Sequence, residues 1–200
     1  LPPALLSQEL RDLADFLKEE GLAPDWRGEE FAWLDDVGHE RFRVERAIFR
    51  SLGFHSRACH INGYTPNKEV WLGKRSATKA TDPNMLDNIA AGGINADETP
   101  QQCASRELWE ESGIPTDVSQ LIEPIGIIHV KRVVEPKGLH DESLFTFDLE
   151  LPDDFIPRNN DGEVESFMRI PYASAADLIL EGALTPDAAA VSADFLLRRA

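Results

Sequence analysis

The stretch that decides the fold reads GGINADETPQQCASRELWEESGI, from residue 92 to residue 114. Three of its carboxylates, Glu107, Glu110 and Glu111, lie three and four residues apart near the end of a predicted helix. Residues at this spacing share one helix face, where like charges repel by ~0.2–0.5 kcal/mol per pair. The helix dipole adds to the cost, because acidic groups are disfavoured at a helix C-terminus. A solvated acidic face is one interpretation, and a bound cation such as Mg²⁺, which prefers oxygen ligands, is the other.

The local sequence predicts where this helix begins and ends. Thr99 is expected to be the N-cap, with Pro100 at the first helical position and Gln102 completing a capping box. Ser112 is expected to end the last turn, and Gly113 to take the left-handed conformation that closes many helices. A glycine-rich loop, a helix of about three turns and a closing loop are therefore predicted in that order.

The spacing of the fixed letters resembles the Nudix box at every defined position. The matching residues are Gly92, Glu98, Arg106, Glu107, Leu108, Glu110, Glu111, Gly113 and Ile114. This resemblance implies a Nudix hydrolase with an α/β/α sandwich and a mixed sheet, and Mg²⁺ or Mn²⁺ as its cofactor. Periodicity alone would predict only an α/β or α+β fold.

The resemblance also implies a set of metal ligands within the box. Glu107 and Glu111 are the first choice, with Glu110 joining when the substrate brings a second ion. Gly92 is expected to let the backbone approach the metal closely, so that a carbonyl serves as a ligand. Arg106 is expected to orient one of the carboxylates through a bidentate pair.

Residues outside the helix are expected to contact the substrate. Lys74, Arg75 and Lys79 are three cations in a strongly acidic chain, and they form a predicted basic patch for a diphosphate. Trp71 and His129 are candidates for contact with an aromatic part of the substrate. Both lie on predicted strands, however, where a position in the core is the favoured interpretation.

A few further polar residues have weaker assignments. Glu163, in a predicted late turn, is a candidate metal ligand or general base, although an ordinary acidic turn is favoured. Glu98 is expected to support the glycine-rich loop rather than to bind metal. Cys103 is expected to be a small buried apolar residue. His140 and Asp141 fall in a predicted loop and receive no role.

Other stretches resemble the Nudix branch that is associated with thiamin pyrophosphokinase. They are residues 60–64, 71–76, 86–93 and 160–167. That branch carries a characteristic N-terminal segment, expected here at residues 1–55, ahead of a Nudix domain at residues 56–200. The resemblance implies hydrolysis of thiamin diphosphate, and especially of its oxidised oxo and oxy analogues, to the monophosphate and phosphate.

Composition limits which kinds of partner and which cellular compartment are expected. The 200 residues suit a single domain with its own core, or one domain with a small appendage. Acidic residues outnumber basic ones by 36 to 20, for a net charge of −16, so the field repels nucleic acids and anionic membranes. The expected partner is a small-molecule diphosphate, and a homodimer is left open. The two cysteines form no disulfide framework and no secretory signal opens the chain, so cytoplasm is the expected compartment.

Hydrophobic periodicity predicts the remaining elements. Helices are expected at residues 5–20, 44–52, 174–180 and 186–198, the last capped by Thr185. Strands are expected at residues 57–64, 69–73, 124–130, 144–151 and 165–170. Residues 65–68 have turn chemistry, so the first two strands are predicted to form a hairpin.

Three alternative functions remain open at this point. The box specifies diphosphate chemistry and not the attached group, so a nucleotide sugar, a dinucleotide or a capped nucleotide is one alternative. A second is an isoprenoid-diphosphate isomerase, which needs a reactive cysteine, and Cys59 does not lie in a suitable loop. The third is a non-catalytic ligand sensor, which can lose box carboxylates that this chain retains.

Overall fold

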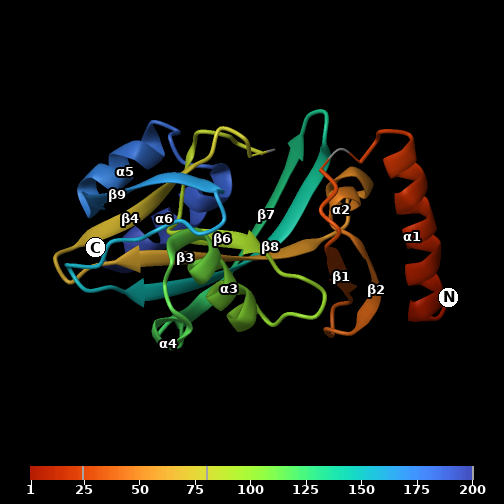
Figure 1. Cartoon of the computed structure of the whole chain (residues 1–200), viewed down its shortest axis with the longest axis horizontal. Coiled ribbons are helices and arrows are strands. Elements are labelled where there is room, and N and C mark those ends of the chain that lie inside the picture. Colours follow the sequence, from red (N-terminus) through yellow and green to blue (C-terminus); the bar gives the residue numbers. More distant parts are fainter. Residues whose placement is uncertain (24, 80, 200) are drawn as a thin grey trace. The chain divides into compact units, whose positions relative to one another are not determined.

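The computed structural model describes residues 1–23, 25–79 and 81–199. The helices are α1 (Pro3–Glu19), α2 (Ala47–Leu52), α3 (Pro100–Ser112), α4 (Thr116–Ser119), α5 (Tyr172–Leu180) and α6 (Pro186–Arg199) (Figure 1). The strands are β1 (Glu30–Leu34), β2 (Glu40–Glu45), β3 (Ser56–Tyr64), β4 (Glu69–Arg75), β5 (Leu86–Asp87), β6 (Ala90–Gly93), β7 (Glu123–Val134), β8 (Gly138–Glu150) and β9 (Val164–Pro171). None of the described helices is both long and apolar enough to cross a membrane.

The chain forms two compact units. The first comprises residues 1–57, 93–99 and 129–143, and the second comprises residues 58–92, 100–128 and 144–200. In the first unit, α1 lies beside the antiparallel pair β1–β2 (Figure 1). The apolar stripe of α1 packs onto a core that contains Phe31, Phe42, Val44 and Phe49.

One boundary in the first unit differs from the sequence prediction. The helix expected from residue 44 begins only at Ala47, and Val44 belongs to β2. Phe42 and Val44 are both buried, two residues apart, which is the period of a strand rather than of a helix. The helical pattern was therefore extended wrongly across the end of a strand.

The second unit contains most of a seven-stranded sheet. Its central order is β5-β4-β3-β8-β7, with β6 paired to β3 and β9 paired to β4. The predicted hairpin is confirmed, since β3 and β4 pair antiparallel with Tyr64 opposite Val70. The strand predicted at residues 165–170 is confirmed as β9, which pairs with β4 along its whole length.

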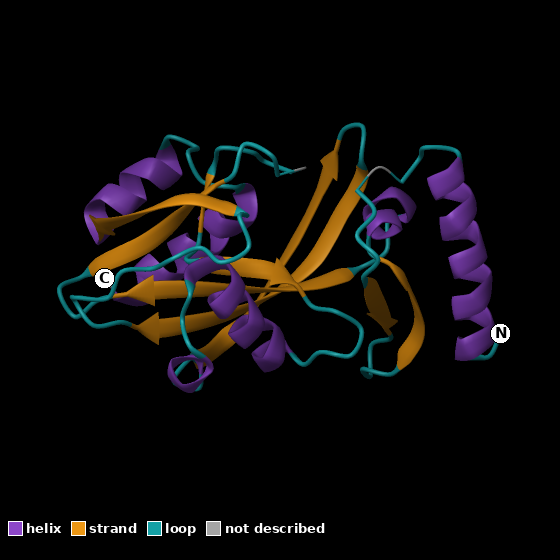
Figure 2. Ribbon diagram, viewed as in Figure 1, coloured by secondary structure: helices purple, strands orange, loops and turns teal. Residues whose placement is uncertain are grey.

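Helices cover both faces of this sheet (Figure 2). Successive strand residues point to opposite faces, and on β3 the sulfur of Cys59 lies 3.1 Å from that of Cys103 on α3. Tyr64, on the other face of β3, has its ring 5.5 Å from that of Phe195 on α6, with the two ring planes tilted by 44°. The expected α/β sandwich, with helices on both faces of one sheet, is therefore confirmed for the described residues.

The box helix follows its predicted bounds. It runs from Pro100 to Ser112, and Gly113 has a φ of 68°, the left-handed conformation expected of a helix-closing glycine. The backbone N–H groups of Gly113 and Ile114 donate to the carbonyls of Trp109 and Leu108, at 3.1 and 3.0 Å. These bonds satisfy two of the carbonyls that a helix leaves unpaired at its end.

Candidate functional site

Two buried carboxylates on α3 form the centre of the site. Glu107 and Glu111 lie one turn apart and are only 8% and 5% exposed. The backbone N–H of Ala91, on β6, donates to Glu111 Oε2 at 2.9 Å. Gly92 lies against the other carboxylate, where an added Cβ would come within 1.9 Å of Glu107 Oε1. The absence of a side chain at residue 92 therefore makes room for a carboxylate.

Arg106 connects the box carboxylates. Its Nη1 donates to Glu107 Oε1 at 2.6 Å and to Glu110 Oε2 at 3.1 Å. The sequence predicted a pair with one carboxylate, whereas the guanidinium contacts two. Charge-assisted bonds of this kind fix the direction of a carboxylate. Arg106 therefore holds two of the three predicted ligand carboxylates in place.

A second acidic segment meets the helix at Glu111. Glu111, Asp161 and Glu163 each have one carboxylate oxygen within 4.8 Å of those of the other two. Lys79 lies among them, with its Nζ 3.3 Å from Glu111 Oε1 and in contact with Glu163. The lysine side chain is only 11% exposed. One protein cation thus lies against Glu111, a carboxylate that the sequence predicts to be a metal ligand.

Burial disfavours the charged form of both carboxylates. It raises the pKa of Glu111 to about 8, against the opposing effect of Lys79. Burial also raises the pKa of Glu107, with Arg106 acting in the opposite direction. Strongly perturbed carboxylates in one cluster are typical of functional sites. A divalent cation would satisfy both groups.

The loop that carries Asp161 and Glu163 is attached to the end of α3. The N–H of Arg158 donates to the Ser112 carbonyl and that of Asn160 to the Glu110 carbonyl, both at 2.9 Å. The Asn160 side chain donates to the Trp109 carbonyl at 2.7 Å. The last carbonyls of a helix lack partners within it. Here the loop supplies those partners, and the bonds place its acidic turn beside the helix.

The three cations of the predicted basic patch have carboxylate partners. Lys74 lies 2.9 Å from Glu165, and Arg75 lies 2.8 Å from Asp87. Arg75 also donates to the carbonyl oxygens at residues 81 and 82, which ties down the segment after β4. Lys79 alone reaches the box carboxylates. Diphosphate binding by Lys74 and Arg75 stays a prediction.

The two candidate aromatic contacts have different surroundings. Trp71 is buried on β4, as expected, and its indole Nε1 has no hydrogen-bond partner among the described residues. The core position predicted for His129 is wrong, because its side chain is exposed on β7. Its Nδ1 lies 3.0 Å from Ser143 Oγ. Because Ser143 on β8 supplies a polar partner, the imidazole is accommodated at the surface.

The minor assignments can also be compared with the structure. Cys103 is fully buried, as predicted, and forms no disulfide. Glu98 accepts a hydrogen bond from the N–H of Asn95 at 3.1 Å, as expected for a residue that supports this loop. The loop predicted at His140 and Asp141 is wrong, because both residues belong to β8. The polar character of this end of the strand concealed it.

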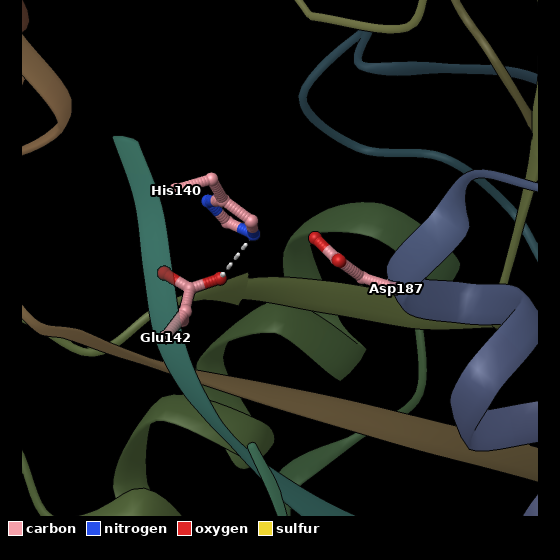
Figure 3. Close-up of side chains that lie close together, drawn as sticks. All are labelled: His140, Glu142 and Asp187. Carbon is pink, nitrogen blue, oxygen red and sulfur yellow. Dashed lines mark ion pairs between the residues drawn. The ribbon is translucent and has the colours of Figure 1, made fainter. Parts of the chain in front are cut away.

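A polar network in the first unit was missed by the sequence analysis. His55 Nδ1 lies 2.6 Å from Asp141 Oδ1, and its Nε2 lies 2.8 Å from Ser143 Oγ. Lys131 adds a second contact to Asp141 at 2.5 Å. His140 and Glu142, the residues on either side of Asp141 in β8, form an ion pair with an N–O distance of 3.7 Å (Figure 3). We interpret these contacts as structural, because those of Asp141 and Ser143 join β8 to the residue just before β3 and to β7.

Comparison with known proteins gives a consistent family assignment. The family model described as NUDIX domain matches residues 53–195. Nudix hydrolase 20, chloroplastic, of Arabidopsis thaliana is 32% identical over 197 residues, which cover 96% of this chain and 52% of that protein. Nudix hydrolase 24, chloroplastic, of the same plant is 36% identical over 161 residues, which cover 78% and 44%. The chain spans about half the length of the curated relatives it matches.

A solved structure supports the fold. The crystal structure of DR0079 from Deinococcus radiodurans superimposes with a TM-score of 0.66. The alignment covers 83% of this chain and 98% of that one, at 17% sequence identity. At this identity the likeness concerns the fold alone.

Proposed function

Because this chain belongs to the Nudix family, we propose that it hydrolyses a diphosphate linkage in a small molecule, with Mg²⁺ or Mn²⁺ as cofactor. The observation that carries the proposal is the buried pair Glu107 and Glu111, which faces a protein cation and a second acidic segment. Buried carboxylates in such numbers are costly without positive charge. A divalent cation and a diphosphate together would supply and balance that charge.

The residues present fit a hard divalent ion. Glu107 and Glu111 would hold it, with Glu110 as a further ligand and the Gly92 carbonyl as a backbone ligand. The missing side chain at Gly92 leaves the space that the Glu107 carboxylate fills. Oxygen donors of this kind are the ligands that Mg²⁺ prefers. When bound, the ion would draw charge from phosphate oxygens and lower the pKa of an attacking water.

The remaining residues of the site have roles that follow from their contacts. Arg106 would orient Glu107 and Glu110, because one of its nitrogens donates to both. Glu163 would accept the proton of the attacking water at a carboxylate oxygen, since it lies beside Glu111. Lys79 would turn from these carboxylates to the diphosphate. Lys74 and Arg75 would add positive charge at the end of β4.

For the substrate, we propose a thiamin-type diphosphate, with the oxo and oxy analogues preferred. The support is the likeness of four separate stretches to the thiamin-pyrophosphokinase-associated branch, together with an N-terminal segment at residues 1–55 ahead of a Nudix domain at residues 56–200. A preference for an added oxygen would come from a hydrogen bond, since unpaired buried polar groups discriminate strongly. A nucleotide sugar or a dinucleotide is the alternative substrate class.

The test is a comparison of substrates on the purified chain with Mg²⁺ and with Mn²⁺. A compound with a terminal diphosphate releases phosphate directly, whereas a nucleotide sugar or a dinucleotide gives two monophosphates. Chromatography of the products therefore separates the two classes. We expect kcat/KM to be highest for an oxidised thiamin diphosphate. If a nucleotide compound had a kcat/KM more than about tenfold higher, the proposed substrate would be wrong, although the proposed diphosphate hydrolysis would still stand.

A further inference from the structure

An open groove of about 460 Å³ lies in the second unit, beside the sheet pair β4–β9. Its floor includes Trp71 on β4 and Phe167 and Arg169 on β9. Trp71 pairs directly with Arg169, and Gly73 pairs with Phe167. Residues opposite each other in neighbouring strands, and residues two apart in one strand, share a face of the sheet. The three floor side chains therefore point to the same side.

The groove offers flat apolar surfaces. Trp71, Phe167 and the half-buried Phe155 line it, and Ile156 at its edge is 72% exposed. The indole Nε1 of Trp71 is buried without a partner among the described residues. A buried donor without a partner costs free energy. Because that nitrogen is buried, a ligand ring would gain stacking contacts with the half-buried Phe155 and Phe167 rather than a hydrogen bond to it.

The charge at the groove favours a cation. Asp153 and Asp154 contribute carboxylates from the loop between β8 and β9. Arg169, the one basic residue among the lining side chains, has Glu69 as an ion-pair partner at 3.1 Å and lies over the ring of Trp71. With the arginine paired in this way, the two aspartates dominate. Cations are also attracted to aromatic faces, and since Arg169 already lies over the Trp71 ring, Phe155 and Phe167 supply the other aromatic surfaces of the groove.

The groove lies within reach of the α3 carboxylates. Phe167 follows Glu163 by four residues, which corresponds to about 13 Å along an extended strand at ~3.3 Å per residue. The loop that supplies Asp153 and Asp154 to the groove continues to Asp161, whose carboxylate lies beside that of Glu111. One elongated molecule can therefore place an aromatic ring at one end of this loop and a diphosphate at the other.

We propose that this groove binds a positively charged aromatic ring of the substrate. The inference rests on the proposed function, because it assigns the other end of the same diphosphate ester. It adds Asp153, Asp154, Phe155 and Phe167 as residues that select the substrate. A neutral ring would lose the attraction of the two carboxylates. The groove would thus discriminate by charge as well as by shape.

The experiment measures binding rather than turnover. Thiamin, which carries the ring and no phosphate, is titrated by calorimetry into the full chain without metal. A second pair of probes, 1-methylnicotinamide and nicotinamide, has similar shapes and differs in charge. The variants are Asp153→Asn with Asp154→Asn, and Asp36→Asn as a control that removes an exposed carboxylate in the other unit. Thermal unfolding verifies that each variant is folded.

We expect the double variant to bind thiamin about tenfold more weakly than the native chain, and the control to bind it unchanged. We also expect 1-methylnicotinamide to bind the native chain more tightly than nicotinamide. Three outcomes would each overturn the proposal that the groove binds a cationic ring. They are equal thiamin affinity in the double variant, equal affinity of the native chain for the charged and neutral probes, and no thiamin binding at millimolar concentration. Absent diphosphate hydrolysis with thiamin binding retained would instead overturn the proposed function alone.

Discussion

Replacing Lys79 with methionine should tighten the binding of Mg²⁺ in the absence of substrate. The ammonium lies 3.3 Å from Glu111 Oε1 and also contacts Glu163, so an incoming cation must displace it. Methionine keeps the length and apolar stem of the side chain and removes its charge. The lysine therefore acts as a competitor that is already attached to the protein.

The geometry sets the size of the effect. A pair of unit charges 3.3 Å apart at an effective dielectric constant of 20 attracts by about 5 kcal/mol. Much of this is offset by the cost of desolvating both groups. If little more than a quarter remains, about 1.4 kcal/mol, the dissociation constant changes by a factor of about ten. We therefore expect at least a tenfold gain in Mg²⁺ affinity.

Isothermal titration with MgCl₂ at pH 9 measures this affinity directly. That pH lies above the pKa of about 8 that Glu111 has with Lys79 in place. Because Lys79 opposes the rise, the pKa of Glu111 is higher in the variant, so the titration is repeated in buffers of different ionisation enthalpy to measure any proton that Mg²⁺ displaces. Lys68→Met, in the exposed turn between β3 and β4, is the matched control. Unchanged or weaker Mg²⁺ binding in a folded Lys79→Met variant would refute the competition.

Three further predictions concern the helix and the polar network. Glu111→Gln should lower kcat by at least about two decades without unfolding the chain, because it removes charge that matters most in the transition state; native turnover at saturating substrate would exclude this residue as a ligand. Gly92→Ala should reduce the rise in melting temperature caused by Mg²⁺, since its Cβ would lie 1.9 Å from Glu107 Oε1; a full native shift would show that the backbone there can move aside. The contacts of the Asp141 carboxyl with Lys131 and His55 lower its pKa. Its folded pKa is below the unfolded value of about 3.9, so its stabilisation is present above about pH 4 and is lost as the pH falls through the folded pKa. Between pH 6 and pH 3, the free energy of unfolding measured with urea should therefore fall further for the native chain than for Asp141→Asn. Parallel pH curves for the two proteins would contradict this.

Local signals sufficed where the chain itself determines the structure. The bounds of α3 followed from a proline at its start and a glycine after its end, which act on neighbouring backbone groups. The pair Glu107 and Glu111 followed from the geometry of one helix. In both cases the interacting groups lie within one or two turns of each other.

Contacts between distant segments could not be predicted in this way. Lys79 lies 32 residues before Glu111, and no periodicity reports that the two side chains meet. Asp161 was overlooked because an acidic turn is common on surfaces, and its importance appears only when its oxygen is found beside Glu111. The short strands β5 and β6 carry too few residues to show an alternation.

The segment from Asp153 to Glu163 has two ends with different degrees of freedom. Near Asn160 its backbone is bonded to the last turn of α3, so the acidic turn moves only with the helix. Near Asp153 and Ile156 its side chains face an open groove. A mutation at the open end can change which molecule is accepted and leave the hydrolytic carboxylates undisturbed. This division would let evolution, or a protein engineer, exchange one substrate for another by altering a few loop residues while the chemistry is inherited intact.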